Sequence, residues 1–272
     1  MEIKKVAFFL SLKEPAIALA REIGEFLVSR QLEVSFPEDS TPEKDWFTGA
    51  DLILSVGGDG TFLRAARKVK DRGTPILGIK MGGLGFLTEI AVDQWQESLE
   101  TVLAGEYRVE DRLTLDCRVQ RDGETVFQDF ALNEAVLSHL TPHLLHSAIH
   151  LDGDFAGSFH CDGLIVSTPT GSTAYSLSAG GPILSPAVSG LVIAPICPHI
   201  LSSRPLVVSD RETVTIKEMG AYQASLALDG SVIYHIHPRD EMVIKKSDIK
   251  INFLRVKKSF YRQLREKLKW VE

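Results

Sequence analysis

Asp59 is the residue whose surroundings most clearly predict chemistry in this chain. It lies in the stretch GGDGT at 57–61, which follows an apolar run and precedes a helical pattern. Strand, glycine turn and helix together point free backbone N–H groups, and the positive end of a helix dipole, at an anion such as a phosphate. Because a carboxylate repels phosphate, Asp59 indicates a metal ligand or a base that takes a proton from an attacking hydroxyl. A glycine-rich turn in which Asp59 caps the helix is the alternative.

This loop matches neither of two familiar nucleotide-binding patterns. Residues 58–63 have the G-x-G-x-x spacing, but Leu63 stands where a dinucleotide fingerprint needs a small residue so that helix and strand can touch. The Lys-Ser/Thr pair of a Walker loop is also missing. The loop therefore does not predict a dehydrogenase or a Walker-type ATPase.

A second informative stretch, 162–182, is crowded with hydroxyl residues and glycines after a short strand. Hydroxyls beside glycine offer side-chain and backbone donors to a polar ligand, and Tyr175 could stack on a base. Asp162 could accept hydrogen bonds from ribose hydroxyls. A Ser/Thr-rich turn with helix capping is the alternative, in which Asp162 is only a turn residue.

Asn133 and Glu134 interrupt an apolar segment that we expect to form one strand over 125–138. Adjacent strand residues face opposite sides, so at least one of these polar groups points to an interior or a cleft. An amide can pair with an adenine edge, and a carboxylate can hold ribose or a metal-bound water. Two buried polar groups satisfied by nearby backbone are the alternative. Asp229-Gly230, taken alone, predicts an ordinary hairpin turn.

The elements that position these residues predict two domains. Residues 1–106 alternate strands, near 6–10, 32–36, 50–54 and 74–79, with helices, which predicts an α/β domain with a parallel sheet and Asp59 at a strand's carboxyl end. Residues 107–256 predict a β-rich, antiparallel, sandwich-like domain with one short helix near 173–179. Separate strands are expected at 242–244 and 249–256. A C-terminal helix within 257–272 is expected to pack back on the first domain.

Composition limits the classes of function. The chain has 272 residues, 44% of them hydrophobic and 24% charged, as in an ordinary soluble globular protein. A net charge of -6 argues against a general nucleic-acid binder. Three distant cysteines without a CxxC motif, and no clustered histidines, predict neither a disulfide framework nor a zinc site. The apolar run at 6–10 is too short for a signal peptide or a membrane span, so we expect a cytoplasmic protein with no membrane partner.

Taken together, the motifs resemble those of the NAD kinase family. The matching segments are GGDGT at 57–61, GGLGFL at 82–87, Asn133-Glu134, 162–182, PICPH at 195–199 with RPL at 204–206, and Asp229-Gly230. The first motif alone is shared with diacylglycerol kinases, and a close variant occurs in 6-phosphofructokinases. The long match at 162–182 is far more specific.

The resemblance implies transfer of the γ-phosphoryl group of ATP, or of polyphosphate in some members, to the adenosine-ribose 2′-hydroxyl of NAD, which gives NADP. It implies an α/β domain followed by a β-rich domain, with NAD in the cleft between them. It also implies a divalent cation, typically Mg²⁺, and a homodimer or homotetramer. A lipid kinase that shares the glycine-Asp loop and a non-catalytic NAD(P)-binding sensor are the alternative functions.

The resemblance also implies roles for residues of the first domain. Asp59 corresponds to the family's proposed catalytic base, and Gly58 and Gly60 lie beside the phosphates. Arg64, one turn into the helix, contacts phosphate. Phe86, in the second glycine-rich loop, lines the NAD pocket; from the residues alone that loop could equally be a tight turn with Phe86 in the core.

In the β-rich domain the resemblance implies that Asn133 pairs with adenine and that Glu134 helps to hold ribose or metal. The other implied dinucleotide contacts are His160, Asp162, Thr173, Ala174, Tyr175, Ser178 and Asp229. This chain departs from the family pattern at His160, where many members have Arg or Lys, and at Leu144, near a position that is often basic.

Overall fold

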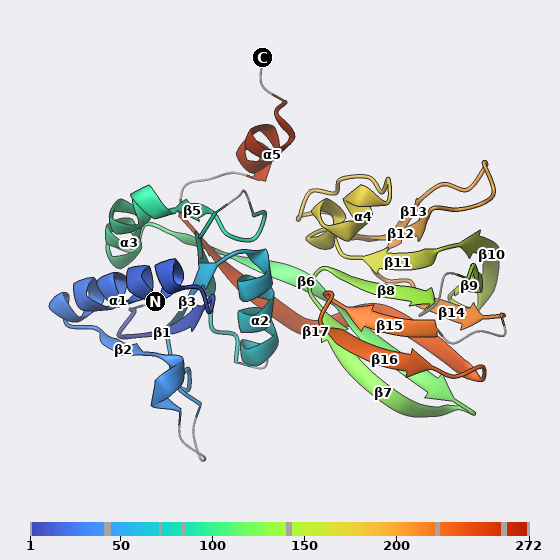
Figure 1. Cartoon of the computed structure of the whole chain (residues 1–272), viewed down its shortest axis with the longest axis horizontal. Coiled ribbons are helices and arrows are strands. Elements are labelled where there is room, and N and C mark those ends of the chain that lie inside the picture. The colour runs from blue at the N-terminus through green and yellow to red at the C-terminus, as the bar shows by residue number, and fades with distance from the viewer. Residues whose placement is uncertain are drawn as a thin grey trace. The chain divides into compact units, whose positions relative to one another are not determined.

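The computed structural model describes residues 2–40, 45–70, 72–82, 85–139, 143–220, 224–256 and 260–270. The chain forms two compact units: the first contains Met1–Asp111 and Ile251–Glu272, and the second contains Arg112–Lys250 (Figure 1). The chain passes between the units at 111/112 and at 250/251. Each of these boundaries lies within one long strand, β6 (Arg108–Arg121) or β17 (Asp240–Arg255). The domain limits expected from the sequence, 106/107 and 256/257, fall a few residues away, at the ends of these strands.

A parallel sheet forms the centre of the first unit, with the strand order β2-β1-β3-β4. The short β5 and the last part of β17 both pair in parallel with β4. The predicted parallel α/β arrangement is therefore confirmed. The elements are β1 Lys5–Leu10, α1 Glu14–Ser29, β2 Glu33–Ser35, β3 Leu52–Gly57, α2 Asp59–Val69, β4 Ile76–Lys80, β5 Ile90–Ala91, α3 Trp95–Leu103 and α5 Phe260–Leu268, with 3₁₀ turns at Pro37–Asp39 and Val92–Gln94.

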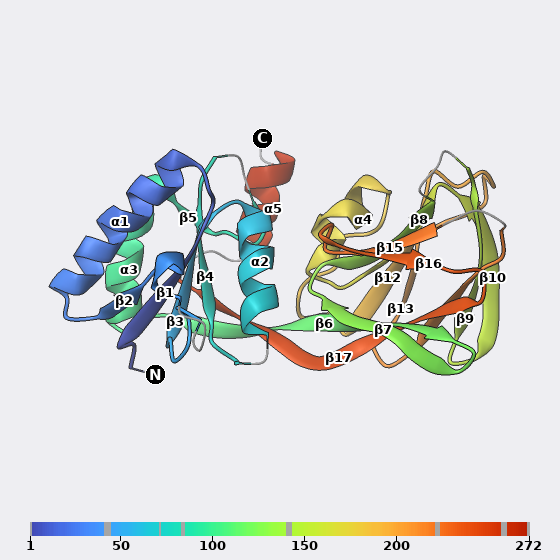
Figure 2. The same ribbon diagram turned by 60° about the horizontal axis from the view of Figure 1, so that its bottom comes forward.

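Helices cover both faces of this sheet: α1 and α3 lie on one face and α2 on the other (Figures 1 and 2). Pro15 in the first turn of α1 has the fixed φ that a helix start favours. The apolar residues of α1 recur at helical spacing and are buried against the strands. Every residue of β3 is buried, as expected for a strand covered on both faces.

The strand order reverses between β1 and β3, because β1 leads outward to β2 while β3 lies on its other side. In open α/β sheets, ligands bind outside the carboxyl ends of the strands at such a point. Helix α2 begins there, immediately after β3, and Asp59 is its first residue. The topology therefore places the glycine-Asp loop where this class of fold binds its ligands.

Two antiparallel sheets form the second unit. One has the order β13-β12-β11-β8-β15-β16, and the other contains β10-β9-β14-β17, with β6 paired to β17 and β7 paired to β6. Apolar side chains from both sheets make one core, so the predicted β-rich domain is confirmed. The elements are β6, β7 Glu124–Ala131, β8 Glu134–His139, β9 Leu145–Leu151, β10 Asp154–Cys161, β11 Gly163–Ser167, a 3₁₀ turn Gly171–Thr173, α4 Tyr175–Ser178, β12 Gly190–Ile196, β13 Leu206–Ser209, β14 Val214–Glu218, β15 Ala224–Leu228, β16 Val232–Ile236 and β17.

Several strand limits differ from the sequence expectation. The single strand expected over 125–138 is two strands, β7 and β8, which belong to different sheets. Conversely, the strands expected at 242–244 and 249–256 are one continuous strand, β17, whose polar middle carries partly exposed residues. Strands β12 and β16 were not expected; Gly190 and Pro195 lower the strand propensity of β12.

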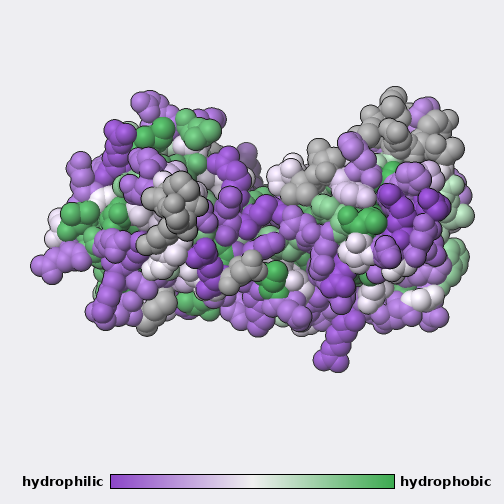
Figure 3. Space-filling model, turned by 90° about the horizontal axis from the view of Figure 1, so that it is seen from below, coloured by the Kyte–Doolittle hydropathy of each residue, from purple (hydrophilic) through white to green (hydrophobic). Residues whose placement is uncertain are grey.

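The C-terminal helix α5 belongs to the first unit, as predicted. Its residues Gln263 and Leu264 are buried, and Lys267 lies over the ring of Phe86. Of the helices in the described residues, none is both long enough and apolar enough to cross a membrane. On the face shown in Figure 3, hydrophobic residues form small separate patches among hydrophilic ones.

Candidate active site

In the first unit, the carboxylate of Asp59 is bound by the backbone of the second glycine-rich loop. Its Oδ2 accepts a hydrogen bond from the N–H of Phe86 at 2.7 Å. Its Oδ1 accepts from the N–H of Leu87 at 3.1 Å, and from the N–H and hydroxyl of Thr88 at 3.3 and 3.4 Å. The side chain at the start of α2 thus joins the loop 57–61 to residues 86–88 of the second loop.

Gly85 makes this arrangement possible. A Cβ atom at position 85 would lie 2.0 Å from Asp59 Oδ1 and 2.5 Å from Thr88 Oγ1. Both distances are far shorter than a non-bonded contact, so any other residue would push the Asp59 carboxylate out of its bonds. This glycine is therefore required by a close approach of the chain to a functional side chain.

The other candidate residues of the first unit surround the start of α2. Gly58, the N-cap, and Gly60 are exposed. Arg64 is also exposed, and its Nη2 donates to the carbonyl of Leu10 at 3.1 Å, at the end of β1. Phe86 is half-buried. The structure thus brings Asp59, Gly58, Gly60 and Phe86 together, with Arg64 one turn further along the helix.

In the second unit, Asp229 fixes the break between β7 and β8. Its carboxylate accepts hydrogen bonds from the N–H groups of Leu132 at 2.9 Å, Asn133 at 2.7 Å and Glu134 at 3.3 Å. Its own N–H donates to the carbonyl of Glu134 at 3.0 Å. Asp229 has a positive φ of 51°, so it turns the chain as predicted, but its side chain also holds a segment far away in sequence.

Asn133 and Glu134 are both buried, and each has an oxygen without a hydrogen-bond partner among the described residues: Oδ1 of Asn133 and Oε2 of Glu134. Burial, with a smaller contribution from the charge of Asp229, raises the pKa of Glu134 to about 8, against a hydrogen bond from the Tyr175 backbone. Buried polar atoms are normally paired. These two atoms are therefore ready to accept hydrogen bonds from a ligand.

The hydroxyl-rich stretch packs against this break. Thr168 Oγ1 donates to the carbonyl of Leu132 at 2.6 Å, and its backbone N–H donates to the carbonyl of Asn133 at 2.9 Å. Gly171 comes so close that a Cβ there would lie 2.1 Å from the Asn133 carbonyl oxygen. The hydroxyls of Ser167, Ser172 and Thr173 likewise donate to nearby backbone carbonyls. The Oγ of Ser176 is buried without a partner in the described structure.

The remaining predicted dinucleotide contacts differ in exposure. Thr173 is buried, Ala174 is half-buried, and Tyr175 and Ser178 are exposed. The exposed fraction of Tyr175 is 45%, which leaves its ring available for stacking on a base.

Two of the predicted contacts, His160 and Asp162, lie on and after β10. The ring of His160 stacks on that of His146, with 3.9 Å between centroids. Asp162 is exposed, and its N–H donates to the carbonyl of Ile196 at 2.9 Å. Leu144, the other position where the family pattern is often basic, is 38% exposed. The structure shows no link between His160 or Asp162 and the Asn133–Glu134 pair among the contacts of the described residues.

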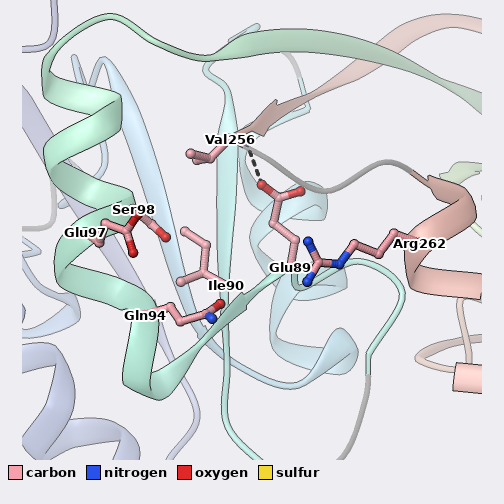
Figure 4. Close-up of a pocket in the computed structure, with 7 residues that line it drawn as sticks. All are labelled: Glu89, Ile90, Gln94, Glu97, Ser98, Val256 and Arg262. Carbon is pink, nitrogen blue, oxygen red and sulfur yellow. Dashed lines mark hydrogen bonds between the residues drawn. The ribbon is translucent and has the colours of Figure 1, made fainter. Parts of the chain in front are cut away.

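A hollow of about 230 Å³ in the first unit is lined by other residues (Figure 4). It is lined by Glu89, Ile90, Gln94, Glu97, Ser98, Val256 and Arg262. Glu89 is already paired, since its oxygens accept from the Val256 N–H at 2.7 Å and from Arg255 at 3.2 Å. None of its lining residues is a candidate from the sequence, so it is not the predicted nucleotide site.

Comparison with known proteins decides the family. Residues 43–107 match the sequence model of the ATP-NAD kinase N-terminal domain, and residues 132–256 match that of the ATP-NAD kinase C-terminal domain. The NAD kinase of Desulforamulus reducens is 41% identical over 262 residues, which cover 92% of this chain and 91% of that protein. This chain belongs to the NAD kinase family.

Other members of the NAD kinase family agree with this assignment. The NAD kinase of Methanothermobacter thermautotrophicus is 41% identical over 264 residues, which cover 93% of this chain and 92% of that protein. The crystal structure of yeast NADH kinase with NADH matches 99% of this chain and 89% of that chain, with a TM-score of 0.88 and 25% identity. The Archaeoglobus fulgidus NAD kinase in complex with ATP matches 99% of both chains, with a TM-score of 0.80 and 28% identity.

The NAD kinase resemblance read from the motifs is therefore confirmed, as are the fold class and the assignment to an enzyme family. The contacts made by Gly85 and Thr88 with Asp59 were not predicted. The signal for them was present in the second glycine-rich loop, because a glycine at a loop often marks a close approach of backbone to another group. The family models end at residue 256, so α5 lies outside both matches.

Proposed function

We propose that this enzyme transfers the γ-phosphoryl group of ATP to the 2′-hydroxyl of the adenosine ribose of NAD, which yields NADP. The observation that carries the proposal is the carboxylate of Asp59, held at the start of α2 by the loop 86–88 in a chain of the NAD kinase family. The related kinases with NADH and with ATP support these two substrate classes.

In this reaction the ribose 2′ oxygen attacks the γ-phosphorus while the bond from that phosphorus to the β–γ bridging oxygen breaks. ADP leaves with the electron pair, and the proton of the hydroxyl passes to the carboxylate of Asp59. The Oδ2 atom is suited to receive it, because it accepts one hydrogen bond from Phe86 whereas Oδ1 accepts three from Leu87 and Thr88. A positioned base of this kind contributes roughly 10²–10⁴-fold to the rate.

We assign ATP binding to the first unit and NAD binding to the second. Exposed backbone at Gly58 and Gly60, with the positive end of α2, suits the donor's phosphates. The partnerless Oδ1 of Asn133 suits the amino group of adenine, and the carboxyl of Glu134 suits ribose hydroxyls. The exposed ring of Tyr175 offers a stacking surface for the base. Thr173, Ala174, Ser178, His160, Asp162 and Asp229 remain predicted contacts.

A divalent cation, most simply Mg²⁺, accompanies the ATP in this proposal. The described residues contain no group of three or more His, Cys, Asp or Glu side chains that could enclose a metal ion. Mg²⁺ keeps several waters and is usually held by substrate phosphates with one or two carboxylates. When bound, the cation neutralises phosphate charge; we assign no residue of this chain to it. A homodimer or homotetramer is likewise proposed from the resemblance, and a cytoplasmic location from the short apolar run at 6–10 and the three distant cysteines.

The test is to incubate the pure protein with NAD, ATP and Mg²⁺ and to measure NADP with an NADP-specific dehydrogenase. Polyphosphate replaces ATP in a parallel reaction to identify the donor, and diacylglycerol replaces NAD to test the lipid-kinase alternative. NADP formation supports the proposal. Lipid phosphorylation without NADP formation, or NAD binding without turnover of any donor, would contradict it and favour the lipid kinase or the sensor respectively.

A further inference from the structure

Helix α5 brings a lysine to the loop that holds Asp59. The ammonium Nζ of Lys267 lies 3.6 Å from the centroid of the Phe86 ring. The backbone N–H of the same Phe86 donates to Asp59 at 2.7 Å. Lys267 therefore contacts a residue that itself binds the predicted catalytic carboxylate, although Lys267 is 208 positions later in the chain than Asp59.

A second lysine, Lys80, also lies near Asp59. Lys80 is the last residue of β4, and β3 and β4 are neighbours in the parallel sheet, so Lys80 and Asp59 lie at the same carboxyl edge. Burial lowers the pKa of Lys267, the charge of Asp59 raises it, and the charge of Lys80 lowers it further. Lys267 is thus close enough to both groups to feel their charges, and the attraction of Asp59 exceeds the repulsion of Lys80.

The charge balance at this edge favours an anion. Two ammonium groups and one carboxylate leave a net positive charge, and the start of α2 adds roughly half a positive charge. The carboxylate of Asp59 accepts hydrogen bonds from the loop, and no ion pair of Lys267 or Lys80 is present among the described residues. An anionic ligand beside Asp59 would relieve the repulsion between the lysines.

We infer that Lys267 of the C-terminal helix, together with Lys80, binds the terminal phosphates of the phosphoryl donor. The inference rests on the proposed function for its donor, ATP. It assigns a substrate contact to a helix that lies outside both family-model matches. A flexible ammonium on a long stem suits a phosphate whose charge and position change during transfer.

The substitution Lys267→Met tests this inference, because Met keeps an unbranched stem beside the Phe86 ring and removes only the charge. The matched control is Lys269→Met, since Lys269 is exposed near the end of the same helix. Lys267→Arg is the conservative variant. Each full-length variant is titrated with Mg²⁺-ATP in the absence of NAD, and separately with NAD, by isothermal calorimetry. Thermal unfolding shows which variants are folded.

We expect Lys267→Met to weaken Mg²⁺-ATP binding by roughly 10- to 100-fold, the factor of one hydrogen bond to a charged group. NAD binding should stay within about twofold, Lys269→Met should match the wild type, and Lys267→Arg should restore most of the loss. Lys80→Met should weaken ATP binding similarly, which keeps the inference testable if Lys267→Met does not fold. Unchanged ATP binding by both Met variants, or an equal loss in Lys269→Met, would overturn it.

This experiment separates the inference from the proposed function, because ATP binding is measured without turnover. A wild-type protein that binds ATP through Lys267 but forms no NADP would sustain the inference and refute the function. Normal NADP formation by Lys267→Met, with an unchanged KM for ATP, would sustain the function and refute the inference.

Discussion

The buried carboxyl of Glu134 makes the stability of the second unit depend on pH in a direction that can be calculated. Its pKa is raised from 4.5 to about 8, first by burial and then by the charge of Asp229. The folded protein therefore binds a proton more tightly than the unfolded chain between these two values. The free energy of unfolding accordingly falls as pH rises through this window, and the loss is complete above about pH 8.

The size of the effect follows from the shift. One pKa unit corresponds to about 1.4 kcal/mol, so the shift from 4.5 to about 8 corresponds to an upper limit of about 5 kcal/mol. Glu134→Gln cannot ionise and removes this contribution. We expect the variant to gain stability relative to the wild type as pH rises from 5 to 9.

Urea unfolding at pH 5, 7 and 9 measures this difference directly. Glu124→Gln is the control, because Glu124 is exposed at the start of β7. If the difference in free energy of unfolding between the wild type and Glu134→Gln is the same at pH 5 and at pH 9, the claim that Glu134 is held as a neutral acid is refuted.

Four further substitutions, two of them controls, test the loops. Gly85→Ala should lower turnover and destabilise the protein by about 1–3 kcal/mol, because its Cβ would displace the Asp59 carboxylate; this is measured by steady-state kinetics and urea unfolding. Gly60→Ala should cause no such loss of stability, since nothing lies within 4 Å of a Cβ there. Asp229→Asn should cost about 1–3 kcal/mol, because one of the three backbone donors it binds loses its acceptor. Asp152→Asn, at another turn with positive φ, should cost less, since among the described residues its carboxylate accepts from Thr213 alone; equal losses in chemical denaturation would contradict the bridging role of Asp229.

The sequence was sufficient for features that depend on local patterns. The strand before Asp59, the glycine turn and helix α2 each have a clear signal, and the alternation of strands and helices predicted the parallel sheet. The strand β16 also had such a signal, an apolar run after the Asp229-Gly230 turn, and the sequence interpretation missed it.

Other features depend on residues far apart in the chain, which a local pattern cannot reveal. The continuous strand expected over 125–138 breaks because Asp229, about a hundred residues later, captures the N–H groups of 132–134. For the same reason, the sequence predicted only an ordinary turn at Asp229-Gly230, because the distant backbone that Asp229 binds gives no local signal. Lys267 belongs to no recognisable motif. Its proposed role in phosphate binding follows only from the position of α5 in the first unit, where Lys267 contacts Phe86.

The central claim is that Asp59 accepts the proton of the attacking ribose hydroxyl, and Asp59→Asn tests it most directly. Asn keeps the size of the side chain and one carbonyl oxygen for the loop 86–88 but is not a base. Single-turnover NADP formation at saturating ATP and NAD should fall at least about a hundredfold, while the dissociation constant for NAD stays near that of the wild type. Asp59→Asn turning over at the wild-type rate would contradict the claim.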